Sequence, residues 1–288
     1  MKKIPFNLSI DFEDLAYDLL RSIGETPQVS YHALETSYEV INSYSNNKLG
    51  SKKLTFFTTG TVARTMPDIL KQMVRDGHEV GSHYNLHDLM YKQSNYDIAK
   101  NLNIAKESIF KACGQEPIGF RAPVFSITPN RLDIFEEINK FFRYDSSHVL
   151  NLNINNKSYY ETLEPFNSMD LIEFPIVPKG YMGGRAQIKS GGTFLRLFSK
   201  KVIKDVMEYN HLHGFTPQVY MHPYDYLSNQ EFWVPFKEFS RSKKISSLVK
   251  YFRQNQWSRL GNSSVFSKLD YILKYFDHQG TLSSSINV

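Results

Sequence analysis

Cysteine and long apolar runs are scarce in this chain of 288 residues. The single cysteine, Cys113, excludes an internal disulfide framework and agrees with a reducing compartment. No apolar run approaches the length of a membrane span, and the few apolar residues before Asp11 are too short for the core of a signal peptide. We therefore expect a cytoplasmic protein.

Blocks of like charge are also missing. The net charge is +5, but Lys and Arg are spread along the chain, so nucleic-acid binding is not indicated. With 41% hydrophobic and 22% charged residues, the chain has the composition of a globular protein with a full core. A basic, aromatic stretch at 239–259 is either an ordinary solvated helix or a peripheral contact with anionic lipid. Its members are Lys243, Lys244, Lys250, Arg253 and Trp257.

Seven short segments rich in β-forming residues alternate with segments of helical periodicity. This alternation predicts an α/β fold of the β/α-barrel kind. The glycine-rich segment from Gly180 to Gly192 is too loosely spaced for a phosphate loop and is predicted to be a lid or rim. The predicted strands are 7–11, 53–59, 78–82, 118–121, 142–145, 171–176 and 218–222.

Polar residues fall at or just past the carboxyl ends of five predicted strands. In a β/α barrel these ends lie together on one face, where active sites are built. The five residues are therefore expected to form one site. They are Asp11, His83, Arg121, Asp145 and His222.

His83 and His87 are four residues apart, which places both rings on one face of a helical turn, within reach of one divalent ion. The metalloprotease pattern is absent because Tyr84 follows His83, so a general base must come from another strand. Three carboxylates at 11–14 would repel one another without a cation. The alternative for this acidic cluster is a solvated loop or the first turn of a helix.

This set of residues suits metal-assisted hydrolysis of an amide or ester. Two His and one carboxylate leave positions open on a zinc-like ion for water and substrate. Asp11 fits the role of base and His222 that of acid. Arg121 could hold Asp11 ionised, while Asp145 could bond the second ring nitrogen of His222 and keep it protonated.

Five motifs resemble those of the polysaccharide deacetylases (NodB-homology, carbohydrate esterase family 4) in order and approximate spacing. The resemblance spans about residues 7–226, and the form of the motifs looks closest to the bacterial branch with allantoinase-like and peptidoglycan-deacetylase-like members. The motifs are Ser9–Asp14, His83–His87, Phe120–Pro123, Tyr144–Ser147 and Met221–Tyr224.

The resemblance implies a distorted (β/α)7 barrel that removes N-acetyl groups from a GlcNAc-type sugar. The barrel would cover 1–230, with 231–288 as a helical extension packed on it. The implied cofactor is a divalent metal. Zinc is the preferred ion, and cobalt, nickel and manganese are the alternatives. The implied roles are Asp11 as base, His83 and His87 as ligands, His222 as acid, Arg121 and Asp145 as supports, and the Val124 N–H as oxyanion donor.

The first motif departs from the family pattern of adjacent aspartates, because Phe12 follows Asp11. The carboxylate ligand is then Asp14 or Glu13. Asp14 is preferred because its shorter side chain leaves the strand end where the ion should lie.

Three other functions remain open. A deformylase of a lipid-linked amino sugar would keep every catalytic residue, and a metal-independent allantoinase-like amidase would not need the metal ligands. A non-catalytic carbohydrate-binding descendant would have lost a ligand or the base, and none is missing here. The expected substrate is an N-acetylated oligosaccharide, lipid-linked glycan or nucleotide sugar. A cytoplasmic precursor is favoured because no signal peptide is recognised.

Overall fold

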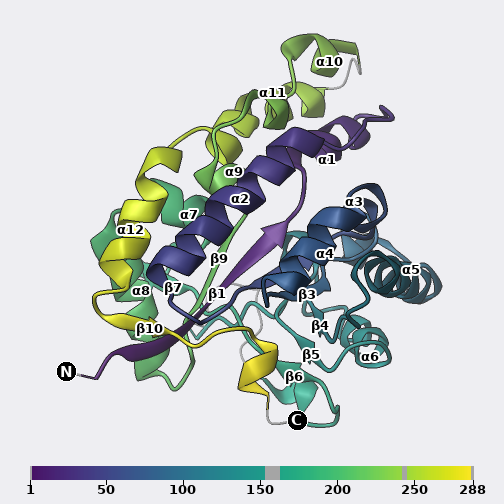
Figure 1. Cartoon of the computed structure of the whole chain (residues 1–288). Coiled ribbons are helices and arrows are strands. Elements are labelled where there is room, and N and C mark those ends of the chain that lie inside the picture. The colour runs from purple at the N-terminus through teal and green to yellow at the C-terminus, as the bar shows by residue number, and fades with distance from the viewer. Residues whose placement is uncertain (1, 153–162, 242–244, 287–288) are drawn as a thin grey trace.

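The computed structural model describes residues 2–152, 163–241 and 245–286, and its centre is a curled, parallel β-sheet with helices on its outer side (Figure 1). The predicted α/β fold is confirmed, and all seven predicted strands are present as β1 to β6 and β9. The strands of the sheet are β1 (Ile4–Phe12), β2 (Thr55–Thr58), β3 (Glu79–Ser82), β4 (Gly119–Phe120), β5 (Tyr144–Asp145), β6 (Ile172–Glu173), β9 (Gln218–Met221) and β10 (Phe276–His278).

The sheet runs in the order β10-β1-β2-β3-β4-β5-β6, and β9 also pairs with β1. Every pairing in it is parallel. Parallel strands align their carboxyl ends, and the register places Asp11 of β1 opposite Phe57 of β2 and Ile10 opposite Met221 of β9. The residues that follow these strands therefore meet on one face of the sheet.

The helices lie between the strands, as the alternation predicts. No helix in the described part of the chain is long and apolar enough to cross a membrane. The α-helices are α1 (Leu15–Arg21), α2 (Tyr31–Lys48), α3 (Gly60–Thr65), α4 (Pro67–Arg75), α5 (Asn95–Cys113), α6 (Asp133–Asn139), α7 (Gly192–Leu197), α8 (Lys200–Leu212), α9 (Pro223–Tyr226), α10 (Phe236–Arg241), α11 (Ile245–Ser258) and α12 (Val265–Ile272).

Strand β1 is the centre of the core. Its residues from Phe6 to Phe12 are all buried, as expected for a parallel strand covered on both faces. The apolar members pack against side chains of β2, β9 and the surrounding helices in one large cluster. Because β1 is fixed on both edges and both faces, the acidic residues at its carboxyl end have a rigid support.

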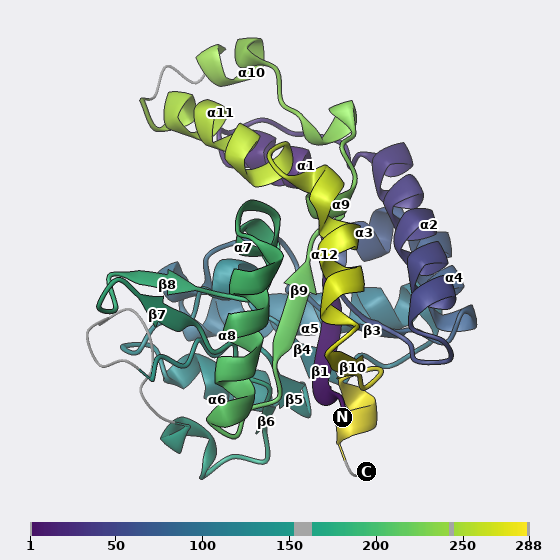
Figure 2. The ribbon, with the colours of Figure 1, turned by 90° about the vertical axis from the view of Figure 1, so that its left-hand side faces the viewer.

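The C-terminal segment differs from the purely helical extension that the sequence predicts. It contains helices, but it also adds strand β10, whose Phe276 pairs with Ile4 at the start of β1. Helix α11 lies beside α1 above the carboxyl ends of the strands (Figure 2). Lys243 and Lys244 of the basic stretch lie outside the described residues. The domain boundary at residue 230 stays a prediction.

The glycine-rich segment forms an antiparallel hairpin of β7 (Lys179–Tyr181) and β8 (Ala186–Ile188). Lys189 and Gly192, just after the hairpin, line a pocket at the carboxyl ends of the strands. This segment is therefore one wall of that pocket, in agreement with the predicted rim.

His78 has a structural role within the sheet. Its Nδ1 accepts the N–H of Leu54 at 3.1 Å, and its Nε2 lies 3.0 Å from Asn42 Oδ1, which requires the proton on Nε2. Burial lowers the pKa of His78 to about 4. The ring therefore stays neutral and joins the start of β2 to α2.

Candidate active site

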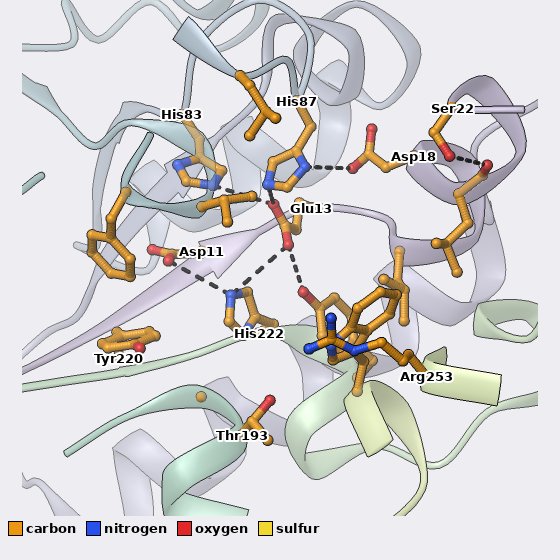
Figure 3. A pocket seen from close by; sticks show the side chains of 18 of the residues that line it. Asp11, Glu13, Asp18, Ser22, His83, His87, Thr193, Tyr220, His222 and Arg253 are labelled. Carbon is orange, nitrogen blue, oxygen red and sulfur yellow. Dashed lines mark hydrogen bonds and ion pairs between the residues drawn. The ribbon is translucent and has the colours of Figure 1, made fainter. Parts of the chain in front are cut away.

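A cavity of about 680 Å³ opens at the carboxyl ends of the strands (Figure 3). Its floor carries Asp11, Glu13, His83 and His87, and its wall carries His222. These residues come from three separate parts of the chain: the end of β1, the segment after β3 and the residue after β9. The fold thus brings four of the seven predicted site residues, Asp11, His83, His87 and His222, into one pocket.

Glu13, His83 and His87 form a cluster whose ligand atoms all lie within 4.8 Å of one another. His87 Nε2 is 2.7 Å and His83 Nε2 is 3.2 Å from Glu13 Oε2. His83 Nδ1 lies 2.8 Å from the carbonyl oxygen of Arg121, which can only accept, so Nδ1 carries the proton. The Nε2 of a neutral His83 therefore directs a lone pair at the carboxylate.

This cluster fits a divalent metal. Glu13 Oε2 is buried and makes no hydrogen bond within the described residues, although two ring nitrogens lie at ion-pair distance. Acceptors that converge in this way need a cation between them. One carboxylate and two imidazoles are a donor set of catalytic zinc sites. The second oxygen of Glu13 accepts the Tyr224 hydroxyl at 2.6 Å, which orients the carboxylate.

The charges in the cluster respond to one another. Burial would raise the pKa of Glu13, but the positive charge of His87 and the closeness of both imidazole rings hold it well below its ordinary value. Burial would lower the pKa of His87, but Glu13 and Asp18 outweigh it and raise the pKa to about 9. A carboxylate that stays ionised at a buried position is what a metal ligand requires.

Asp14 is not part of the cluster, so the preference for it as the carboxylate ligand is corrected in favour of Glu13. Its Oδ1 accepts the N–H groups of Ala16 and Tyr17 at the start of α1, and its Oδ2 accepts the Ser30 N–H at 2.6 Å. Asp14 is the N-cap of α1. Successive side chains of an extended chain alternate, so that Asp11 and Glu13 point to one side and Asp14 to the other.

Arg121 holds Asp11 as the sequence predicts. Its Nη1 donates to Asp11 Oδ1 at 2.7 Å, and the guanidinium is fully buried over the ring of Phe57. Ser9 Oγ and Ser146 Oγ accept further bonds from it. Asp11 Oδ2 remains directed at the pocket, 3.8 Å from His222 Nε2. Asp11 is thus held in place through Oδ1, while Oδ2 faces the pocket.

The partner of His222 is Asp225, which corrects the prediction of Asp145. Asp225 Oδ2 lies 2.7 Å from His222 Nδ1 and also accepts the His222 backbone N–H at 2.8 Å. Burial would lower the pKa of His222, but the charge of Asp225 outweighs it and raises the pKa to about 9. His222 Nε2 is directed at the pocket, near Asp11 and Glu13.

Asp145 is fully buried and does not line the pocket. Its two oxygens accept the backbone N–H and hydroxyl of Ser147 at 2.9 and 2.6 Å. Burial, with the charge of Asp145, raises the pKa of the neighbouring Glu173 well above its ordinary value. The buried pair of Asp145 and Glu173 therefore shares a proton and supports the strand next to Arg121, and no bond from either residue to His222 is recorded within the described residues.

Val124 has an unusual backbone conformation at the pocket edge. Its φ is 56°, in the left-handed region that a β-branched residue rarely adopts. Among the described residues, no acceptor is recorded for its N–H. Because the residue also lines the pocket, that N–H is available to a ligand there.

Comparisons with known proteins agree with this fold. Residues 46–140 match the family model for polysaccharide deacetylase, and residues 154–278 match a domain of unknown function (DUF3473). The second match crosses residue 230 and includes α11 and α12. Residues 46–140 therefore match the polysaccharide deacetylase family, the family that the motifs resemble.

Individual relatives match parts of the chain. An uncharacterised protein of Geobacillus stearothermophilus is 33% identical over 106 residues, 35% of this chain and 39% of that protein. The peptidoglycan-N-acetylglucosamine deacetylase PgdA of Listeria monocytogenes is 31% identical over 71 residues, 25% of this chain and 15% of that protein. The aligned part therefore spans well under half of either relative.

One solved structure shows the same fold across the whole chain. A Mycobacterium smegmatis protein, provisionally described as a polysaccharide deacetylase, has a TM-score of 0.55 at 16% identity. The similarity covers 98% of this chain and 89% of that one. It extends the fold assignment to the C-terminal segment.

Proposed function

We propose that the chain uses a bound divalent metal, preferably zinc, to hydrolyse the N-acetyl group of a GlcNAc-type amino sugar. The observation that supports this most is the convergence of Glu13, His83 and His87 beside Asp11 and His222. Each of the two latter residues is backed by a buried partner of opposite charge.

Glu13, His83 and His87 would hold the ion. When bound, a divalent ion polarises an amide carbonyl and lowers the pKa of water. Tyr224 and the Arg121 carbonyl fix the orientation of two of these ligands through their second polar atoms.

Asp11 would take a proton from the attacking water through Oδ2, while Arg121 keeps Oδ1 in place. His222 would deliver the proton on Nε2 to the amine as the C–N bond breaks, and Asp225 keeps the opposite nitrogen protonated. The Val124 N–H would donate to the oxyanion on the carbonyl carbon. The products are acetate and the free amino sugar.

The first experiment measures metal content and acetate release from N-acetylglucosamine oligomers. Wild type should hold close to one ion per chain and release acetate, and His83→Ala should lose both. His211→Ala, an exposed residue on α8, is the matched control and should keep both.

The other functions predict different results. Bound metal without acetate release, together with formate release from an N-formylated amino sugar, would identify a deformylase. Full amidase activity without metal would refute the metal mechanism and favour an allantoinase-like reaction.

A further inference from the structure

One wall of the pocket comes from helix α11. Lys250, Arg253 and Trp257 are three and four residues apart along the helix, so they share one face, and all three line the pocket. Figure 3 shows the Arg253 side chain reaching from α11 toward His222. This wall belongs to the basic, aromatic stretch 239–259 and follows the last of the five family motifs.

Two acidic residues of the pocket already have a basic partner. Asp11 is paired with Arg121 at 2.7 Å, and Asp88 is paired with Arg21 at 2.6 Å. The Arg253 guanidinium, by contrast, lies 5.1 Å from the centre of the Trp257 ring. No carboxylate within the described residues lies within 4 Å of it.

A second cation stands on the wall that follows the β7–β8 hairpin. Lys189 Nζ lies 4.6 Å from the centre of the Phe125 ring. Burial lowers the pKa of Lys189 to about 8, so a nearby anion would stabilise its charged form. Both walls therefore combine a cation with an aromatic ring, and rings of this kind stack against the apolar faces of sugars.

We propose that the pocket recognises an anionic glycan. A carboxylate or phosphate carried by the substrate binds Arg253, with Lys250 and Lys189 nearby, while a sugar ring packs on Trp257. This inference deepens the proposed function and rests on it, because the anion would lie beside the amino sugar that is deacetylated. Arg253 and Trp257 face the pocket, which favours a soluble anionic substrate over a lipid surface as their partner.

The chain offers a matched pair of arginines for the test. Arg259 also stacks on a tryptophan, 3.7 Å from the centre of the Trp233 ring, but it does not line the pocket. Arg253→Gln and Arg259→Gln remove the same charge. Binding of chitotetraose, a hyaluronan tetrasaccharide and UDP-GlcNAc is measured by calorimetry, with acetate release from chitotetraose in parallel.

Wild type should bind at least one of the anionic ligands about tenfold more tightly than chitotetraose, and Arg253→Gln but not Arg259→Gln should remove this preference. Preference for the hyaluronan fragment assigns the carboxylate, and preference for UDP-GlcNAc assigns the phosphate. Equal binding of neutral and anionic ligands, equal effects of the two variants, or binding to anionic vesicles alone would overturn the inference. Selective binding without acetate release would refute deacetylation and leave the anion site standing.

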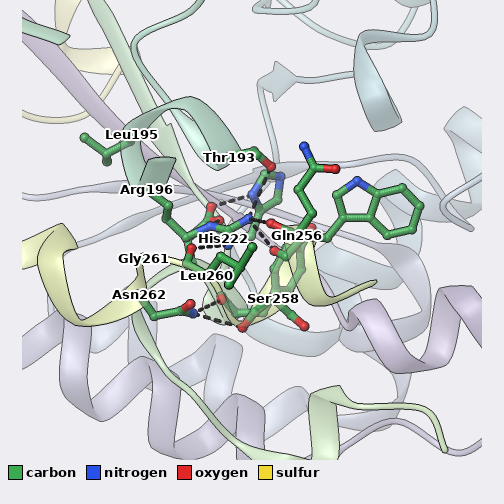
Figure 4. Close-up of polar contacts among 12 residues, drawn as sticks. Thr193, Leu195, Arg196, His222, Gln256, Ser258, Leu260, Gly261 and Asn262 are labelled. Atoms are coloured by element: carbon green, nitrogen blue, oxygen red, sulfur yellow. Dashed lines mark hydrogen bonds and ion pairs between the residues drawn. The ribbon is translucent and has the colours of Figure 1, made fainter. Parts of the chain in front are cut away.

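A separate observation concerns Arg196 of α7, which is almost fully buried and joins α11 to His222 (Figure 4). Its Nε donates to Asp225 Oδ1 at 2.5 Å, and Asp225 Oδ2 bonds His222. The rest of the guanidinium donates to the carbonyls of Gln256, Trp257 and Leu260 at the end of α11. Those carbonyls have no partner within the helix itself.

We infer that Arg196 is a positioning residue for His222. Its charge favours the ionised form of Asp225, and its two-sided bonding fixes the carboxylate that orients the imidazole. The carboxyl end of α11 is then required both for the pocket wall and for the geometry of the proposed acid.

Lys268 provides the control for Arg196. It is also buried at this corner and donates to the carbonyls of Leu195 and Arg196, but no bond from it to Asp225 is recorded. We compare Arg196→Lys, which keeps the charge, with Lys268→Met. The readouts are melting temperature, kcat, KM and the downfield proton resonance of the His222–Asp225 hydrogen bond.

Arg196→Lys should lower kcat about tenfold at unchanged KM, a part of the 10²- to 10⁴-fold that a general acid contributes. It should also shift or broaden the downfield resonance. Lys268→Met should change only the melting temperature. If both variants melt earlier while the resonance and kcat of Arg196→Lys match wild type, Arg196 is purely structural and the inference is wrong.

Discussion

Replacing the carboxylate by an amide should have different effects at the adjacent residues Glu13 and Asp14. Glu13→Gln replaces the carboxylate of the metal cluster, whereas Asp14→Asn replaces the N-cap of α1. Each variant removes one negative charge and keeps the size of the side chain. Loss of metal should therefore follow Glu13, and loss of stability should follow Asp14.

The expected effect of Glu13→Gln is on metal affinity. Changes to groups that merely orient metal ligands already weaken binding by about 10- to 100-fold, and removal of a ligand charge should exceed that. The fold should persist, because Tyr224 can still donate to the amide oxygen of Gln at this position.

The expected effect of Asp14→Asn follows from its three hydrogen bonds. The amide oxygen can keep the bonds to Ala16 and Tyr17, but the NH₂ group then faces the Ser30 N–H, which Oδ2 accepts at 2.6 Å. An N–H left without its acceptor lowers the free energy of unfolding by about 1–3 kcal/mol. At about 2–4 °C per kcal/mol, the melting temperature should fall by roughly 2–12 °C.

Metal content is measured by plasma mass spectrometry after gel filtration, and melting by circular dichroism of the apo proteins. The apo state is used because bound metal would itself raise the melting temperature. If Asp14→Asn loses the metal while Glu13→Gln retains it, the assignment of the carboxylate ligand is wrong.

Three further predictions concern His78, Asp225 and Tyr224. The pKa of His78 is about 4 in the folded state, so its contribution to stability is fully present above about pH 6.5. As the pH falls toward 4, the free energy of unfolding should decrease by roughly 2–3 kcal/mol, which urea titrations at several pH values in this range measure. Asp225→Asn should lower kcat about 100-fold or more through His222, while Asp145→Asn should mainly lower the melting temperature. Tyr224→Phe should weaken metal binding about 10- to 100-fold, measured by competition with a chelator.

Each of these predictions has a distinct contrary outcome. The pH slope should shrink in His78→Gln, and an unchanged slope would assign the acid sensitivity to other groups. A larger loss of kcat in Asp145→Asn than in Asp225→Asn would restore the partner expected from the sequence. Unchanged metal affinity in Tyr224→Phe would show that the hydroxyl does not orient the ligand.

The sequence carried more information about this site than the simplest motif comparison uses. Asp11 and Glu13 are two residues apart at the end of a strand, so the two-residue period of an extended chain already places both on one side. An Asp directly before an amphipathic helix is a frequent N-cap, which describes Asp14. The preference for Asp14 rests on the length of its side chain. The direction in which a side chain points decides which carboxylate faces the ion.

The same holds for the partner of His222. Pro223 starts a helix, so His222 is the N-cap residue before it. An acidic residue three positions after the N-cap completes a capping box, and this spacing predicts Asp225 as the neighbour of His222. Asp145 ends a different strand, and its distance from His222 depends on the curvature of the sheet. Local spacing was the better guide here because a capping box needs no tertiary information.

The sequence alone determined the seven parallel strands and the residues at their carboxyl ends, because side-chain period, turn residues and strand direction are local properties. Only the tertiary structure decided that β10 pairs with β1, that α11 forms a wall of the pocket, and that Arg196 joins that helix to Asp225. Arg196 and Leu260, for example, are 64 residues apart in the chain. Contacts of this range leave no periodic pattern in the sequence, since they depend on how whole elements pack against one another.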